Sequence, residues 1–197
     1  MFLKAYRVKM IVAIIFTAFV IKMIDDYIDD DNKLLKKLIY NMGTGVLPYG
    51  LIIFSMACLL DKEVSISLLF SAYIIGMFSD LNRKLSFKIK GYQEGVLVFL
   101  VGTLLIGLYP MISSFLIMLL LQLIDDIIDL KLDRMNNNSN LVDRFGLVEV
   151  ILFSLIIVLI LIKINIIKLI VCLIVFLVFA ALEVFWVGGK KDGSHNL

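Results

Sequence analysis

Charged residues, histidine and cysteine are all scarce in this sequence, and each shortage excludes a class of function. Asp, Glu, Lys and Arg make up 18% of the 197 residues, against about a quarter in a typical soluble domain. The single histidine, His195, lies in the polar tail "GGKKDGSHNL", so the chain offers neither a Ser/His/Asp catalytic set nor a zinc site. Cys58 and Cys172 both lie inside apolar segments, which indicates buried thiols rather than a disulfide or a metal site. The net charge of +2 is too small to indicate nucleic acid as a partner.

Hydrophobic residues, by contrast, make up 61% of the chain, and the mean hydropathy is +1.03. They form apolar segments at 8–24, 46–60, 64–82, 94–109, 111–130, 146–162 and 165–187. Most of these reach the roughly 17 to 25 residues that a membrane-spanning helix needs. We therefore expect an all-α membrane protein in which residues 1–197 form a single transmembrane domain of seven helices. No small-residue cleavage site follows the first segment, so we interpret it as a retained helix rather than a signal peptide.

Short and long connections alternate along the chain. The connections "DKE" at 61–63, Pro110 and "KIN" at 163–165 are short, whereas those at 29–43, 83–95 and 131–146 are long and polar. The long connections therefore share one side of the membrane with the C-terminal tail. That side carries twelve basic residues, namely Lys33, Lys36, Lys37, Arg83, Lys84, Lys88, Lys90, Lys131, Arg134, Arg144, Lys190 and Lys191. The other side carries six, namely Lys4, Arg7, Lys9, Lys62, Lys163 and Lys168.

Because positive charge favours the cytoplasmic side, we expect the long loops to be cytoplasmic. The membrane we expect is a bacterial plasma membrane. The basic N-terminus departs from the charge rule, and a short helix lying on the membrane surface would account for it.

Two runs of aspartate end the first and fifth apolar segments, on this same side. They are "KMIDDYIDDD" at 22–31 and "QLIDDIIDLKLDR" at 122–134. The spacings of Asp26 and Asp29, and of Asp126, Asp129 and Asp133, are three or four residues, so each run can direct its carboxylates to one helix face. Clustered acids repel and are costly to bury without a cation. Mg²⁺ takes oxygen ligands and commonly joins carboxylates to a substrate phosphate, so two such runs facing each other would hold a Mg²⁺-diphosphate.

The alternative is that these acids are solvated residues at helix ends. That accounts well for a single acid but poorly for two runs that share "IDDxID" at matching positions. Both runs also lie at C-terminal helix ends, where negative charge is unfavourable. Acids at membrane level are more often functional than not.

At these residues the sequence resembles the UbiA superfamily of intramembrane prenyltransferases. The family's first motif is NDxxDxxxD. Here "DDYIDDDNK" has Asp25 at the Asn position, Asp26 and Asp29 at the next two acids, and Lys33 in place of the last Asp. Asp30 or Asp31 is a candidate to substitute for that last acid. The second motif, DxxDxxxD, is intact as Asp126, Asp129 and Asp133.

Further resemblance lies in "RMNNNSNLVDRFG" after the second motif and in "YIIGMFSDLNRKLSFKIKGYQEG" between the motifs. The similarity covers roughly 10–187, and compared with the family we expect the helix that precedes the first motif and the family's last helix to be missing. It implies a Mg²⁺-dependent transferase acting on an isoprenyl diphosphate within the lipid bilayer. The implied catalytic residues are Asp26, Asp29, Asp126 and Asp129, which would also bind metal together with Asp25 and Asp133. The implied diphosphate contacts are Arg83, Lys84, Lys33 and Arg134. Asp133 would either bind metal or orient Arg134.

Other functions remain open at this point. A terpene cyclase of the same superfamily would need no acceptor, and a shortened bundle suits it. A divalent-cation transporter would use the aspartates as an ion path, although such sites usually lie near the middle of the bilayer. A degenerate member retained as a structural or regulatory subunit is a third option.

Several other residues are candidates for minor roles. Tyr27, Tyr49, Tyr73 and Phe78 could stabilise a carbocation through their ring faces, although packing or lipid contact is the commoner role of such residues. Gln122 could face the cavity or hydrogen-bond another helix. Glu149 fits the first turn of a helix, where an acid is favourable.

Overall fold

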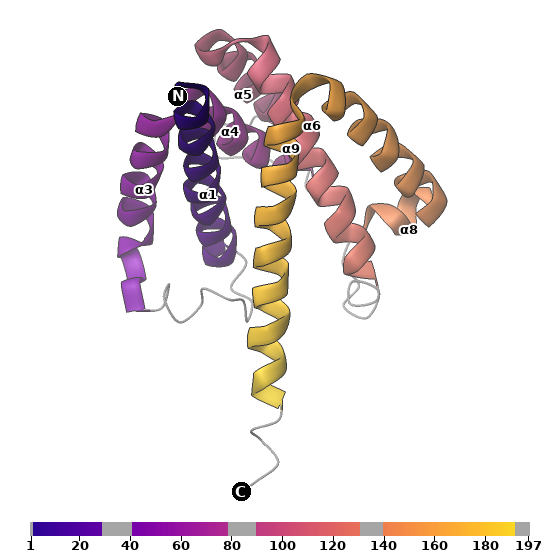
Figure 1. Ribbon diagram of the computed structural model, residues 1–197. Helices are drawn as coiled ribbons and strands as arrows, with labels where there is room; N and C mark the ends of the chain where they lie inside the picture. The colour runs from indigo at the N-terminus through magenta and orange to yellow at the C-terminus, as the bar shows by residue number, and fades with distance from the viewer. Residues whose placement is uncertain (1, 29–40, 79–89, 131–139, 192–197) are drawn as a thin grey trace, which may run out of the picture. The chain divides into compact units, whose positions relative to one another are not determined.

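The computed structural model describes residues 2–28, 41–78, 90–130 and 140–191, and every regular element in these ranges is a helix (Figure 1). The elements are α1 (Phe2–Ile28), the 3₁₀ helix η1 (Gly43–Gly45), α3 (Val46–Leu60), α4 (Lys62–Phe78), α5 (Gly91–Ile106), α6 (Leu108–Ile128), α8 (Leu141–Phe145) and α9 (Leu147–Lys191). The expected all-α class is therefore confirmed for the described residues.

The short connections form at the predicted places, with one correction. Asp61 ends α3 in an extended conformation and its Oδ1 accepts the backbone N–H of Val64 at 3.2 Å, which starts α4. The next break lies at Gly107 rather than at Pro110. Gly107 has φ +94° and ψ 159°, a region that is essentially restricted to glycine. Pro110 is instead inside the first turn of α6, where its missing N–H costs no hydrogen bond.

The predicted break at "KIN" is also present, although it falls within the bounds of a single long helix. Asn165 has non-helical φ and ψ of −157° and 85°, and it divides α9 into two segments that Figure 1 draws as a sharp bend. Its Oδ1 accepts the backbone N–H of Lys168 at 3.1 Å and so caps the second segment. The Tyr109 hydroxyl donates to the carbonyl of Ile164 at 2.7 Å, which satisfies one of the orphan carbonyls that end the first segment.

Two short helices, η1 and α8, were not predicted. Within the long loop expected at 131–146, the five residues of α8 form a helix that ends at Gly146, with φ +98°. A Cβ at Gly146 would collide with a Glu149 carboxylate oxygen. Glu149 lies in the first turn of α9, as predicted, and its side chain folds back over the glycine.

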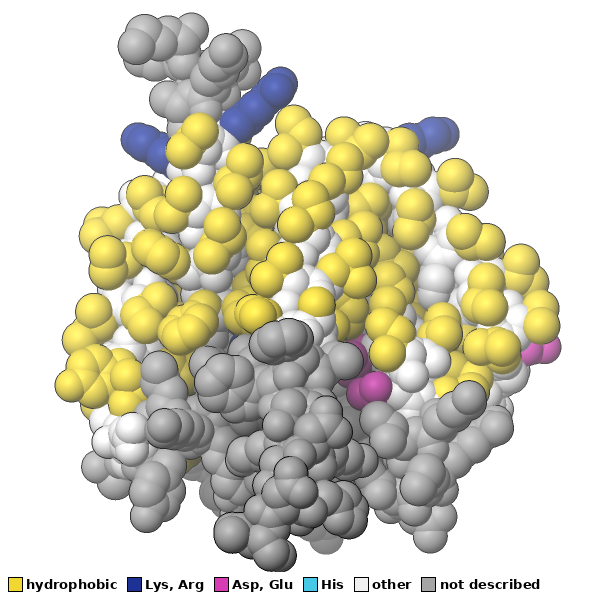
Figure 2. All heavy atoms as spheres, turned by 60° about the horizontal axis from the view of Figure 1, so that its bottom comes forward, with side chains coloured by type: hydrophobic (Ala, Val, Ile, Leu, Met, Phe, Trp, Pro, Cys, Tyr) yellow, Lys and Arg dark blue, Asp and Glu magenta, His cyan; other side chains and the backbone are white. Residues whose placement is uncertain are grey.

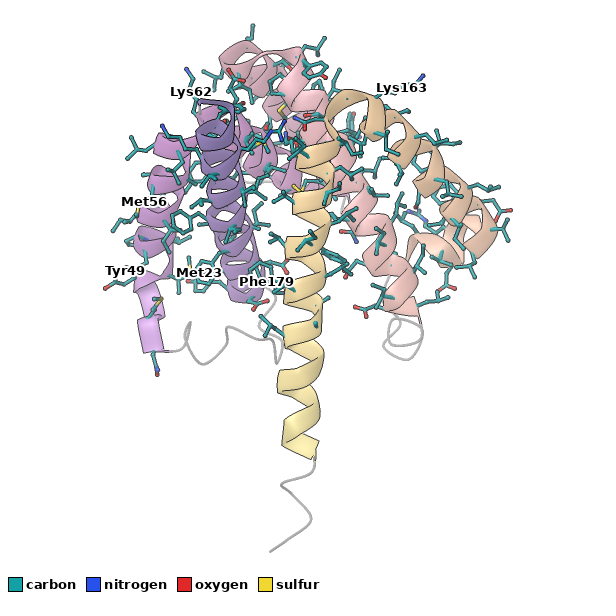
Figure 3. The ribbon with its side chains drawn as sticks, in the orientation of Figure 1. Met23, Tyr49, Met56, Lys62, Lys163 and Phe179 are labelled. Carbon is teal, nitrogen blue, oxygen red and sulfur yellow. The ribbon has the colours of Figure 1, made fainter. Side chains whose placement is uncertain are left out.

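The chain divides into two compact units, residues 1–65 with 171–197, and residues 66–170. In the first unit α1 packs against α3. The buried side of α1 carries Met10, Ala13, Ile14, Thr17, Val20 and Met23, which follow the repeating i, i+3, i+4, i+7 pattern of one helix face. A Cβ on Gly50 of α3 would lie 2.9 Å from the terminal methyl of Met23, so a larger residue there would require the flexible end of the Met23 side chain to move. Figure 3 shows Tyr49 and Met56 of α3 pointing away from α1.

The two helices of this pair run in opposite directions. Met23, near the end of α1, meets Gly50, near the start of α3. At the other end, the negative charge of Asp61 is the largest cause of a raised pKa for the Tyr6 hydroxyl, followed by burial and by Glu63. The residues near the start of α1 therefore lie beside those that follow α3.

In the second unit α5 packs against α6. The absent side chain of Gly102 leaves room for Met111, whose sulfur would lie 2.8 Å from an added Cβ. Phe99 and Phe115 meet edge to face, with their ring centroids 6.0 Å apart.

Polar side chains join three helices of this unit where α4, α6 and the second segment of α9 begin. Lys168 is 2% exposed, and its Nζ donates to Ser114 Oγ at 2.5 Å, to Ser113 Oγ at 3.1 Å and to Ser67 Oγ at 3.5 Å. Ser114 also donates to Ser67 at 2.6 Å. From the sequence, Lys168 was expected among the charges at the short connections. Its ammonium is instead buried among hydroxyls, whereas Lys163 is exposed at the bend (Figure 3).

Two described stretches are long and apolar enough to cross a membrane by length and composition, Leu108–Ile128 and Leu147–Leu182. Val46–Leu60 and Gly91–Ile106 are apolar but shorter. Figure 2 shows hydrophobic side chains over most of the described surface in its view. Such a surface favours lipid rather than water as the surrounding medium.

Candidate functional site: two aspartates at helix ends

The first aspartate run begins in the last turn of α1. Asp26 follows Met23 by three residues and therefore continues the buried side of the helix, and it is 5% exposed. Asp25 and Tyr27, one position to either side, are exposed. The side chain of Asp26 therefore lies on the buried side of α1.

A lysine one turn earlier, Lys22, accompanies Asp26. Lys22 Nζ lies 3.1 Å from Asp26 Oδ1 and 3.8 Å from Asp25 Oδ2. The separations of four and three residues place these side chains on neighbouring positions of one helix face. The sequence signal for this pair is "KMIDD", in which Lys22 precedes Asp26 by four residues.

The second aspartate run ends α6, and Asp126 is its buried member at 7% exposed. Its Oδ1 accepts the side-chain amide of Gln122 at 2.9 Å, and its Oδ2 accepts the backbone N–H of Leu141 at 3.0 Å. Gln122 had been expected to face a cavity or to bond another helix. It bonds instead to a carboxylate one turn later on its own helix.

Asn140 completes the connection between α6 and α8. Its side-chain amide donates to the backbone carbonyl of Asp126 at 2.8 Å, and its Oδ1 accepts the N–H of Val142 at 2.8 Å, as an N-cap of α8 does. Asn140 is 2% exposed. Asn140, fourteen positions later, therefore holds the carbonyl of Asp126, and Leu141, fifteen positions later, holds its carboxylate.

Asp129 lies one turn beyond Asp126 and ends α6. Its φ and ψ of −88° and 4° depart from helical values, and its N–H donates to the carbonyl of Asp125 at 2.8 Å. The side chains of Asp125 and Asp129 are both half-buried. Asp126 is therefore inside α6, whereas Asp129, three residues later, is its C-cap.

The remaining predicted site residues lie outside the described ranges. They are Asp29, Lys33, Arg83, Lys84, Asp133 and Arg134. Of the aromatic candidates, Tyr27, Tyr49 and Tyr73 are exposed, which favours lipid or solvent contact over a role inside a cavity. The Tyr73 hydroxyl donates to Glu94 Oε1 at 2.6 Å.

The donor atoms of these motifs fit Mg²⁺ by their chemistry. Carboxylate oxygens are ligands that Mg²⁺ prefers. Each oxygen of Asp126 accepts one hydrogen bond, and an ionised carboxylate has about four acceptor positions, so each oxygen retains a further one. In the described part of the chain no three His, Cys, Asp or Glu side chains come close enough to hold an ion. A site shared by both motifs stays a prediction, since Asp29 and Asp133 lie outside that part.

No protein-family model matches this chain, and no curated protein or solved structure matches it either.

Proposed function

We propose that this protein is a Mg²⁺-dependent membrane prenyltransferase that binds an allylic isoprenyl diphosphate between its two aspartate runs. One observation carries the proposal: each run contributes a buried aspartate, Asp26 or Asp126, to the last turn of a long apolar helix. Two aspartates in the same setting are what a diphosphate held by metal at both ends would need.

The contacts of Asp126 support this proposal through their charge balance. Among the described residues, its carboxylate is held by two neutral donors, the Gln122 amide and the Leu141 backbone. A buried carboxylate at the C-terminal end of a helix is unfavourable unless a cation compensates it. A divalent ion at the remaining acceptor positions would supply the missing charge.

The proposed roles are those that the resemblance of the two aspartate motifs implies. Asp26, Asp29, Asp126 and Asp129, with Asp25 and Asp133, would hold Mg²⁺, and the bound ion would supply positive charge for the diphosphate leaving group. Lys33, Arg83, Lys84 and Arg134 would bind the outer phosphate oxygens through charged hydrogen bonds. The apolar helices would exclude water from the allylic cation until an acceptor, or a double bond of the same chain, attacks it.

The proposal includes a bundle of seven spans with the aspartate ends at the cytoplasmic face. At 1.5 Å per residue, the 21 residues of α6 are about 31 Å long and match a bilayer core of about 30 Å. The 15 to 17 residues of α3, α4 and α5 give only about 23 to 26 Å. Local thinning of the bilayer would accommodate that mismatch at modest cost.

The test is release of pyrophosphate by the purified full chain from an allylic prenyl diphosphate with Mg²⁺. Asp129→Asn, which removes one charge and keeps the shape, is expected to abolish the release, whereas Asp143→Asn on α8 keeps it. Pyrophosphate release that persists in Asp129→Asn would refute the proposal. Hydrocarbon products would identify a cyclase, and metal uptake into liposomes without diphosphate turnover would favour a transporter.

A further inference from the structure

Lys22, which pairs with Asp26, adds a positively charged residue to the first motif. The side chain of Asp26 is fully buried, that of Lys22 is 18% exposed, and that of Asp25 is 51% exposed. The ammonium therefore approaches the buried carboxylate from the more open side of the helix, where Asp25 also lies.

This ammonium and a metal ion would need the same carboxylate. A lysine stem has four flexible methylene groups, so its ammonium can move by several ångströms without a change in the backbone. Two cations on one carboxylate repel each other, and the pairing of Asp26 with Lys22 then opposes the pairing of Asp26 with a divalent ion. The second motif differs, because the partners of Asp126 in the described chain are neutral.

We propose that Lys22 is the internal cation of the first motif, which neutralises Asp26 when no metal is bound and competes with the metal for that carboxylate. This inference rests on the proposed function, because it takes Asp26 to be a metal ligand. Lys22 thereby lowers the metal affinity of the first motif and keeps the metal-free protein folded. The second motif carries no such competitor among the described residues, and it becomes the tighter of the two.

The experiment measures binding of Mn²⁺, as a paramagnetic substitute for Mg²⁺, to the detergent-solubilised full chain by electron paramagnetic resonance. Lys22→Gln retains a hydrogen-bond donor for Asp26 and removes the charge. We expect it to bind Mn²⁺ about tenfold more tightly or better, since one neighbouring unit charge changes the proton affinity of a carboxylate by that factor or more. Lys22→Arg keeps the charge and is expected to match the wild type.

Two controls keep the result specific to the pair. Lys9→Gln removes a charge from an exposed position of the same helix, and the expected Mn²⁺ affinity is unchanged. Adding Asp26→Asn to Lys22→Gln is expected to cancel the gain. Thermal unfolding gives an independent readout. Without metal, Lys22→Gln is expected to melt at a lower temperature than the wild type. Saturating Mn²⁺ is expected to raise the melting temperature of Lys22→Gln by more than that of the wild type.

Equal or weaker Mn²⁺ binding by Lys22→Gln would overturn this inference. If the wild type binds Mn²⁺ and releases pyrophosphate while Lys22→Gln binds unchanged, only the role of Lys22 is refuted. If the wild type binds no Mn²⁺ and releases no pyrophosphate, the proposed function falls with it.

Discussion

The carboxylate of Asp126 accepts the backbone N–H of Leu141 at 3.0 Å, so the end of α6 is tied directly to the start of α8. The same carboxylate is proposed to bind metal. Asp126 therefore has both a structural and a chemical role, and mutations that separate these roles are the most informative.

Asp126→Ala is expected to impair both folding and turnover, whereas Asp129→Asn impairs turnover alone. The alanine removes the acceptor of Gln122 and Leu141, and an unpaired buried donor costs about 1 to 3 kcal/mol. Thermal unfolding of both variants, measured beside pyrophosphate release, checks this. Wild-type stability in Asp126→Ala would mean that the link to Leu141 contributes little.

Asn140→Ala is expected to lower stability by about 1 to 2 kcal/mol, because Asn140 is both the N-cap of α8 and a donor to the Asp126 carbonyl. The matched change is Asn165→Ala, which removes the cap of the second α9 segment and leaves Asp126 untouched. Both lose stability, and Asn140→Ala alone is expected to weaken Mn²⁺ binding. Equal Mn²⁺ affinity in the two variants would contradict a positioning role for Asn140.

Ser114→Ala is expected to destabilise the protein by about 1 to 3 kcal/mol, because the buried Lys168 ammonium loses its nearest acceptor. Ser154→Ala is the control, since that hydroxyl donates only to the Val150 carbonyl of its own helix in the described structure. Denaturation in detergent measures both. A Ser114→Ala variant as stable as Ser154→Ala would show that Lys168 does not depend on this contact.

Gly107→Ala is expected to cost roughly 1 to 3 kcal/mol, because φ +94° with ψ 159° is unfavourable for any residue with a Cβ. Gly76 in α4 has helical φ and open space around an added Cβ, so Gly76→Ala should be neutral or slightly stabilising. Thermal unfolding compares the two. If both substitutions change the melting temperature equally, the positive φ of Gly107 is not what ends α5.

Much of the helical architecture could be predicted from hydrophobic segment length. α3 has its predicted bounds, and the break at Asn165 lies within the predicted "KIN" turn. The position of the α5–α6 break could not be predicted in this way. Pro110 was expected to mark the break, but proline is tolerated in the first turn of a helix, and Gly107 supplies the positive φ that separates α5 from α6. α8 was missed because five residues are too few for a periodic pattern.

The site could be predicted only in part for a similar reason. The burial of Asp26 and Asp126 follows from spacing along one helix. The link from Asp126 to Leu141 joins residues fifteen positions apart, and no local pattern encodes it. Lys168 was counted as a boundary charge because its serine partners come from other helices, at positions 67, 113 and 114.

The most direct test of the account is binding of an unreactive allylic diphosphate analogue to the wild type, to Asp26→Asn and to Asp129→Asn, each with and without Mg²⁺. The account predicts tight binding only by the wild type and only with Mg²⁺, because the ligand needs a carboxylate from each run. Unchanged Mg²⁺-dependent binding by either variant would contradict a diphosphate held between the two runs.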